Sequence, residues 1–201
     1  MTILAKKEMS EEDIKLQFIT PAILDKWDKN RITMETRITD GKICLNGNFV
    51  HRDKKSAKFA DYVLYWSSSF PIAIVEAKDN NHSVSFGLQQ AIAYAQMMDV
   101  PFVYSSNGDA FYEHDMLTGM ECEIALDDFP PNELMERYKA NANGGQGLSE
   151  NELAVISQPY YSSQNTYEPR YYQRVAVNRT VDAIARGVMR LLLVMATGTG
   201  K

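Results

Sequence analysis

The chain has 201 residues, of which 45% are hydrophobic and 23% charged, and its formal net charge at pH 7 is −5. This composition is typical of a globular protein and excludes disordered, collagen-like and coiled-coil chains. Two cysteines, Cys44 and Cys122, are too few for a disulfide framework and lack metal-ligand spacing. Because we find neither a signal-peptide pattern nor an apolar stretch long enough to span a membrane, we expect a cytoplasmic protein without a membrane partner.

The charges are unevenly distributed along the chain. Residues 1–165 carry 15 Lys and Arg against 24 Asp and Glu, whereas residues 166–201 carry six basic residues against two acidic ones. An acidic body does not attract phosphate through its overall field. If the chain works on DNA, local geometry or a larger partner must therefore bring the DNA in.

The first half of the chain begins with a helical pattern and continues with strand patterns. After Ser10, a good helix cap, we expect a helix over residues 11–27 with a kink or break at Pro21. Asn46-Gly47 predicts a hairpin within residues 42–50. Two aromatic and branched runs follow, and they predict strands over 59–66 and 71–78.

The second half predicts further strands and helices. We expect a helix over 84–98, strands over 101–106 and 110–115, an edge strand over 121–126, and a short helix over 132–139. This order predicts an α/β fold, a mixed β-sheet flanked by helices.

A change in composition suggests a domain boundary. Residues 140–166 are rich in Asn, Gly, Ser and Gln and are interpreted as a linker. The linker separates a first domain, residues 1–139, from residues 167–201. In that last segment we expect a helix over 171–190 and a buried strand over 191–194 that runs into a glycine-rich turn.

Two neighbouring predicted strands carry acidic residues within apolar runs. Alternation places Ile72, Ile74, Glu76 and Lys78 on one face of the second strand, and Asp61 lies in the preceding strand. Two close carboxylates repel each other unless a cation lies between them. Carboxylate oxygens are ligands that Mg²⁺ prefers, so this pair is a candidate metal site in which Lys78 would orient a water or hold a scissile phosphate. The alternative is that Glu-x-Lys forms an ordinary surface ion pair.

The helix that follows adds two polar side chains to this set. Gln90 and Tyr94 are four residues apart and therefore share one helix face, although an amphipathic edge would give the same pattern. The order of Asp61, Glu76-x-Lys78 and Gln90-x-x-x-Tyr94 resembles the PD-(D/E)xK nuclease superfamily, particularly its RecB-like branch. The usual Pro-Asp pair is absent, because Ala60 precedes Asp61.

RecB-like nucleases also place an acidic residue on the first helix. Glu11 or Glu12 would have this role here, and Glu11 is favoured. Alternatively, both carboxylates only stabilise the positive end of the helix dipole.

The last residues, Met195 to Lys201, have the sequence MATGTGK. Following an apolar strand, they resemble the Walker A motif of superfamily 2 helicases, whose backbone N–H groups surround ATP phosphates. The resemblance implies an ATP site formed by Thr197, Gly198, Thr199, Gly200 and Lys201. Upstream, Gln173 resembles the Gln motif that reads adenine, or it is a solvated helix residue. The Ser or Thr that would hold the motor's Mg²⁺ is not in the sequence, so we expect the start of a RecA-like ATPase domain within a longer protein.

A nuclease domain followed by a linker and a helicase motor resembles the R subunit of type I restriction enzymes. This resemblance implies a Mg²⁺-dependent endonuclease that cuts double-stranded DNA after ATP-driven translocation. It also implies methyltransferase and specificity subunits as partners. The alternatives are a stand-alone helicase–nuclease for DNA processing or repair, and a non-catalytic DNA-binding or assembly module of the same fold.

Overall fold

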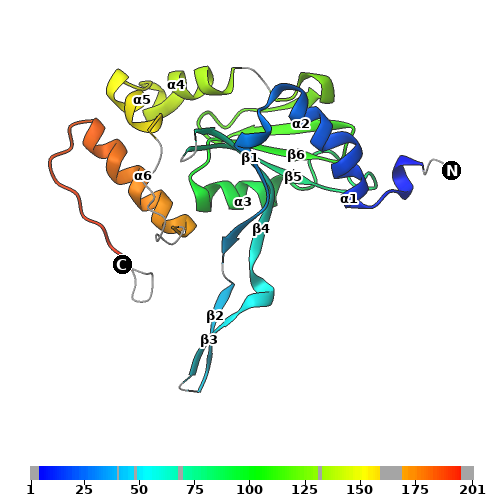
Figure 1. The fold of residues 1–201 in the computed structure, drawn as a ribbon, viewed down its shortest axis with the longest axis horizontal. Coiled ribbons are helices and arrows are strands. Elements are labelled where there is room, and N and C mark those ends of the chain that lie inside the picture. Colours follow the sequence, from blue (N-terminus) through cyan, green and yellow to red (C-terminus); the bar gives the residue numbers. More distant parts are fainter. Residues whose placement is uncertain are drawn as a thin grey trace.

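The computed structural model describes residues 5–39, 41–47, 49–67, 70–130, 133–158 and 169–195. Its centre is a six-stranded sheet in the order β1-β4-β5-β6-β7-β8 (Figure 1). β5 and β6 are parallel, and the other neighbouring strands are antiparallel. The strands of this sheet are β1 (Ile32–Thr39), β4 (Lys58–Ser67), β5 (Phe70–Ala77), β6 (Phe102–Ser106), β7 (Ala110–Asp115) and β8 (Glu121–Ala125).

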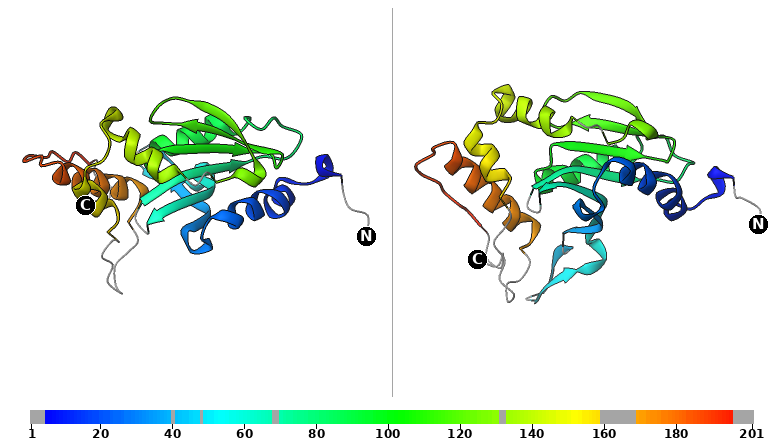
Figure 2. Two further views of the ribbon diagram at one scale, coloured as in Figure 1. Left: turned by 90° about the horizontal axis from the view of Figure 1, so that it is seen from above. Right: turned by 45° about the horizontal axis from the view of Figure 1, so that its top comes forward.

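Helices cover both faces of this sheet (Figure 2). On one face lie α1 (Glu11–Ile14) and α2 (Thr20–Lys26), and on the other lies α3 (Leu88–Met98), the crossover between β5 and β6. Burial on both faces explains why β4 and β5 are nearly continuous apolar runs. The larger core cluster includes Ile14, Ile23, Leu64, Val75, Phe102 and Phe111, and the cluster under α3 includes Val63, Ile74, Leu88, Ala91 and Val103.

The N-terminal helix differs from the prediction at Pro21. The chain does not break there, because a π-helical turn, Lys15–Ile19, joins α1 to α2. The N–H of Thr20 donates to the carbonyl of Lys15, five residues back. Proline has no N–H to continue the ordinary ladder, and the wider turn lies directly before it.

The helix predicted over residues 84–98 begins later, at Leu88. Gly87 caps it, and a Cβ built on Gly87 would lie 3.0 Å from Cγ of Glu76 and 2.9 Å from Oγ of Ser105. Glycine is therefore required where the start of α3 approaches β5 and β6. This close approach brings the first turn of α3 to the end of β5.

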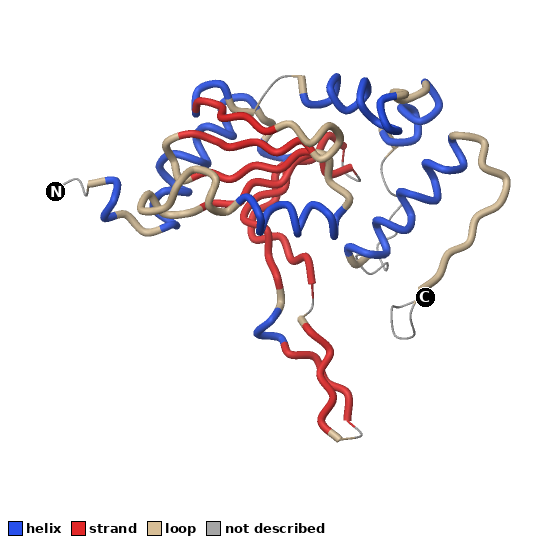
Figure 3. Tube along the Cα trace, turned by 180° about the vertical axis from the view of Figure 1, so that it is seen from behind, coloured by secondary structure: helices blue, strands red, loops and turns tan. Residues whose placement is uncertain are grey.

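A two-stranded hairpin, formed by β2 (Lys42–Asn46) and β3 (Phe49–Asp53), confirms the turn predicted at Asn46-Gly47. It is a sheet of its own and projects away from the body (Figure 3). A short 3₁₀ turn, Lys54–Ser56, connects it to β4.

The C-terminal part differs most from the prediction. α4 (Leu134–Gly145) crosses residue 139, and α5 (Glu150–Ile156) lies inside the segment interpreted as a linker. These helices and α6 (Tyr171–Ala185) gather at the end of the body opposite to the N-terminus (Figures 1 and 2). The helix expected to reach residue 190 thus ends at Ala185.

Residues 191–194, predicted as a buried strand, are irregular and exposed. A strand of this kind is buried only when neighbouring strands and covering helices surround it, and no described strand lies beside it. None of the described helices is long and apolar enough to cross a membrane.

Candidate active site

The carboxylates of Asp61 and Glu76 come from neighbouring antiparallel strands. β4 and β5 pair Tyr62 with Val75, and one further step along this register places Asp61 opposite Glu76. Side chains directly opposite each other in an antiparallel pair share one face. The predicted alternation is correct for Ile74, which packs under α3, but wrong for Ile72, which joins the opposite cluster after a register shift.

Asp61 is buried, and both of its oxygens are hydrogen-bonded. Oδ2 accepts from the backbone N–H of Ala77 at 2.8 Å, and Oδ1 accepts from Nζ of Lys15 at 3.0 Å. Lys15 is itself only 2% exposed and also binds Glu12 and Glu35 at 2.9 and 2.7 Å. Burial lowers the pKa of Lys15, but its three carboxylate partners outweigh this and raise it, so Lys15 is a permanent cation beside Asp61.

Glu76 is equally buried but only half satisfied. Its Oε1 accepts from Nζ of Lys78 at 3.0 Å and from Nε2 of Gln90, whereas its Oε2 is buried without any hydrogen-bond partner. Burial and the nearby charge of Asp61 raise the pKa of Glu76 to about 7, against the lowering effect of Lys78. A buried carboxylate oxygen without a partner is costly, and it marks a position where a cation or proton would be stabilised.

Lys78 follows the last residue of β5 and is mostly buried. Burial lowers its pKa, but contact with Glu76 and the charges of Glu11 and Asp61 raise it above its usual value. Lys78 is therefore placed to donate hydrogen bonds to a water or a phosphate.

The sequence did not decide whether Glu11 or Glu12 belongs to the site, and in the structure the two side chains have different partners. Oε2 of Glu11 lies 3.9 Å from Nζ of Lys78, whereas Glu12 pairs with Lys15. Partial burial raises the pKa of Glu11, with an opposing effect from Lys78. The structure thus brings Glu11, the favoured candidate, next to the Glu76–Lys78 pair.

Gln90 and Tyr94 extend the site along the first turns of α3. Nε2 of Gln90 donates to Oε1 of Glu76 and lies 3.0 Å from the hydroxyl of Tyr94. The ammonium of Lys58, at the start of β4, lies 5.5 Å from the centre of the Tyr94 ring. The Gln-x-x-x-Tyr pair therefore forms a polar chain that ends on Glu76.

Asp61 and Glu76 are the candidate ligands of a divalent cation. No three His, Cys, Asp or Glu side chains in the described ranges are grouped as a ready-made metal site. Mg²⁺ in proteins often binds only one or two carboxylates and keeps several waters. Asp61 and the unpartnered Oε2 of Glu76 fit such a two-carboxylate site.

Sequence reasoning missed three residues that shape this site: Lys15, Glu35 and Gly87. Lys15 and Glu35 resemble ordinary surface charges in sequence, but Lys15 joins helix and sheet through Asp61, and Glu35 adopts a left-handed backbone with φ of 48°. Gly87 carried a detectable signal, because a glycine inside a helical pattern often marks a packing constraint or an end of the helix.

The predicted ATP site lies mostly outside the described residues. The residues of this site that lie outside the described ranges are Thr197, Gly198, Thr199, Gly200 and Lys201. Gln173 is described, and its side chain accepts from the backbone N–H of Arg170 at the start of α6. A cavity of about 620 Å³ lies between α3 and α6, and none of the six candidate nuclease residues lines it.

The fold and the residues at the end of β5 define the class of restriction-endonuclease-like α/β domains. Residues 166–201 match the family model described as "Type III restriction enzyme, res subunit". The EcoAI type I restriction enzyme endonuclease subunit of Escherichia coli is 41% identical over all of this chain and 25% of its own length. The EcoKI endonuclease subunit of E. coli strain K12 is 28% identical over 71% of this chain and 16% of its own length.

A solved structure is also similar to this chain. It is described as a fragment of an HsdR subunit of a type I restriction enzyme from Vibrio vulnificus YJ016, with a TM-score of 0.79 and 38% identity. The match covers 96% of this chain and 36% of the other. The chain is a homologue of type I restriction enzyme endonuclease subunits and spans about a quarter of the EcoAI relative.

Proposed function

We propose that residues 1–139 form the Mg²⁺-dependent DNA endonuclease domain of an ATP-dependent type I restriction enzyme. The observation that carries the proposal is the convergence of Asp61, Glu76 and Lys78 with Glu11 and the Gln90–Tyr94 pair. The similarity to the EcoAI and EcoKI endonuclease subunits supports the same function.

Each residue of the site has a chemical role in phosphodiester hydrolysis. Asp61 and Glu76 would hold Mg²⁺, which supplies charge stabilisation at the scissile phosphate when it is bound. Lys78, held protonated between Glu76 and Glu11, would donate to the attacking water or to a phosphate oxygen. Gln90 fixes the Glu76 carboxylate by binding its Oε1.

The remaining parts of the proposal concern the longer protein. Residues 140–166 would connect the nuclease to a superfamily 2 motor that begins at residue 167. Gln173 and the residues from Thr197 to Lys201 would bind ATP and its Mg²⁺. Methyltransferase and specificity subunits would select the DNA, which explains how an acidic domain reaches a polyanion.

A paired assay on the full-length protein with its partner subunits tests the proposal. Asp61→Ala and Lys78→Ala should lower plasmid cleavage by on the order of 10³-fold and leave ATP hydrolysis nearly unchanged, because neither residue touches the nucleotide. Lys201→Ala should abolish both activities. Cleavage that persists in Asp61→Ala would refute the nuclease site, whereas cleavage that persists only in Lys201→Ala would favour a stand-alone nuclease.

A further inference from the structure

The hairpin that projects from the nuclease body has a distinctive charge. Residues 41–58 carry five Lys and Arg against a single acid, Asp53, whereas the other residues of 1–165 carry 10 basic against 23 acidic. Most of this excess of basic residues lies in β2, β3 and the turn after them. We call residues Lys42–Ser56 the arm.

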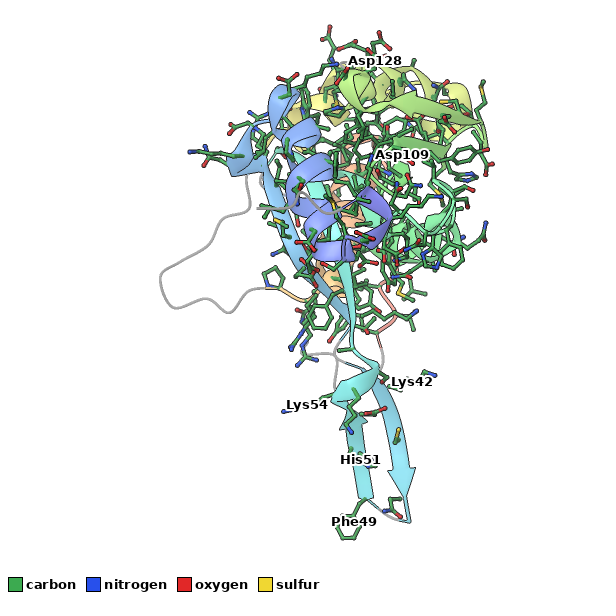
Figure 4. The ribbon with its side chains drawn as sticks, turned by 90° about the vertical axis from the view of Figure 1, so that its right-hand side faces the viewer. Lys42, Phe49, His51, Lys54, Asp109 and Asp128 are labelled. Carbon is green, nitrogen blue, oxygen red and sulfur yellow. The ribbon has the colours of Figure 1, made fainter. Side chains whose placement is uncertain are left out.

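The arm stands free of the body in the structure. Figure 4 shows Lys42 and Lys54 where the arm joins the body and Phe49 at its far tip. Lys42, Lys54 and Lys55 are exposed, and Phe49 is 80% exposed. A lone two-stranded hairpin is at best marginally stable in water. An isolated, basic ribbon with an apolar tip therefore suggests a surface that a partner covers.

The base of the arm leads directly into the candidate active site. Lys54 and Lys55 form the 3₁₀ turn before β4, and Lys58 begins β4 and lies over Tyr94. Asp61 follows three residues later in the same strand. Basic side chains thus continue from the arm to the carboxylates.

We infer that the arm binds the backbone of the double-stranded DNA that flanks the cleavage position and guides it to Asp61 and Glu76. This inference rests on the proposed nuclease function. From Phe49 to Asp61 the extended chain spans roughly 40 Å at most, at about 3.3 Å per residue. That length is comparable with one turn of duplex DNA, and the major groove admits a two-stranded β-ribbon. The arm is basic and DNA is a polyanion, so their charges attract each other.

Two matched double variants test the inference in the 201-residue chain. Lys54→Gln/Lys55→Gln removes two charges from the arm, and Lys26→Gln/Lys29→Gln removes two exposed charges from the body. Binding to a fluorescent DNA duplex is measured by anisotropy over a range of salt concentrations, with EDTA to prevent cleavage. The arm variant should bind several-fold more weakly, and its plot of log K against log salt should be shallower by about 2, because each lost phosphate contact removes roughly 0.9. The body variant should match the unmodified chain.

The possible outcomes separate the arm from the nuclease site. Equal affinities and salt slopes for both double variants would overturn the inference, even if Asp61→Ala abolishes cleavage as proposed. If DNA binding depends on the arm but Asp61→Ala still cleaves DNA, the proposed nuclease site is wrong and the DNA-binding role of the arm stands. If Phe49→Ser prevents assembly with the partner subunits while the arm lysines do not affect DNA binding, the arm is a protein-docking element and the inference is wrong. Circular dichroism of each variant checks that it is folded.

Discussion

Two buried carboxylate clusters lie in the same sheet, and only in one of them does every carboxylate oxygen have a hydrogen-bond partner. Around Glu113 on β7, the guanidinium of Arg137 donates to both carboxylate oxygens at 2.6 and 3.1 Å, and the hydroxyl of Tyr104 donates as well. Arg137 also binds Asp115 at 2.8 Å. Around Glu76, one oxygen has no partner. The protein's own groups provide partners for all carboxylate oxygens of the first cluster. In the second cluster, the remaining oxygen is stabilised only if a cation or a proton is added.

This difference distinguishes structural from functional charge burial. Arg137 and its partners link α4 to β7, and nothing in that cluster is left to bind a ligand. Glu76 has a raised pKa and an unpartnered oxygen, which are features of functional sites. Three variants test whether the two clusters differ in this way.

The largest expected change in stability comes from breaking the complete cluster. Arg137→Met leaves Glu113 and Asp115 buried without their cation and should lower the free energy of unfolding by about 3 kcal/mol, or Tm by roughly 6–12 °C. Lys139→Met, which removes a more exposed contact with Glu136, should shift Tm by far less. Equal effects of the two variants in thermal unfolding would show that the Glu113 cluster is not structural.

Glu76 should make stability depend on pH. Its pKa of about 7 exceeds its ordinary 4.5, so between these values the folded state holds a proton that the unfolded state has lost. Stability therefore falls as pH rises through this window, by up to about 3 kcal/mol in total. In EDTA, the stability of Glu76→Gln should not decrease over this pH range, whereas the stability of Glu123→Gln, a variant at an exposed position, should decrease as in the unmodified chain. Denaturant unfolding between pH 4.5 and 8 measures the difference, and parallel curves for all three proteins would contradict it.

Gln90 should have the smallest effect, because it positions Glu76 without being needed for the fold. Gln90→Ala should reduce cleavage by the full-length complex by roughly 10–100-fold, as second-layer residues of metal sites do. The acidic limb of its pH profile should move to higher pH, since a hydrogen bond to the charged carboxylate is lost. The exposed neighbour Gln89→Ala should behave like the unmodified enzyme. An unmoved pH profile in Gln90→Ala would refute its positioning role.

Most of the sheet and the grouping of the site could be predicted from sequence, because they depend on local signals. Alternation placed Glu76 with Ile74, and the Asn46-Gly47 turn predicted the hairpin. These patterns act between residues close in sequence or in neighbouring strands.

Other features depend on contacts that sequence does not reveal. The ion pairs of Lys15 join a helix to two strands, so their partners lie 20 and 46 residues away. The helices within residues 140–166 were missed because Asn and Gly dominate there, although Ser149 and Glu152 form a capping box that starts α5. The apolar run at 191–194 predicted a strand, but a run of this kind forms one only where other strands pair with it.

We propose that Asp61 and Glu76 form an incomplete charge cluster that binds a divalent cation. This proposal is tested most directly by the Tm of the 201-residue chain at pH 8 as Mg²⁺ is added. The unmodified chain should gain stability as the logarithm of Mg²⁺ concentration above the dissociation constant, and Asp115→Asn should gain equally from a lower starting Tm. Asp61→Asn and Glu76→Gln should show no such gain. If the Tm of the unmodified chain does not change with Mg²⁺, or if the Tm of Asp61→Asn rises equally, Asp61 and Glu76 do not bind the cation.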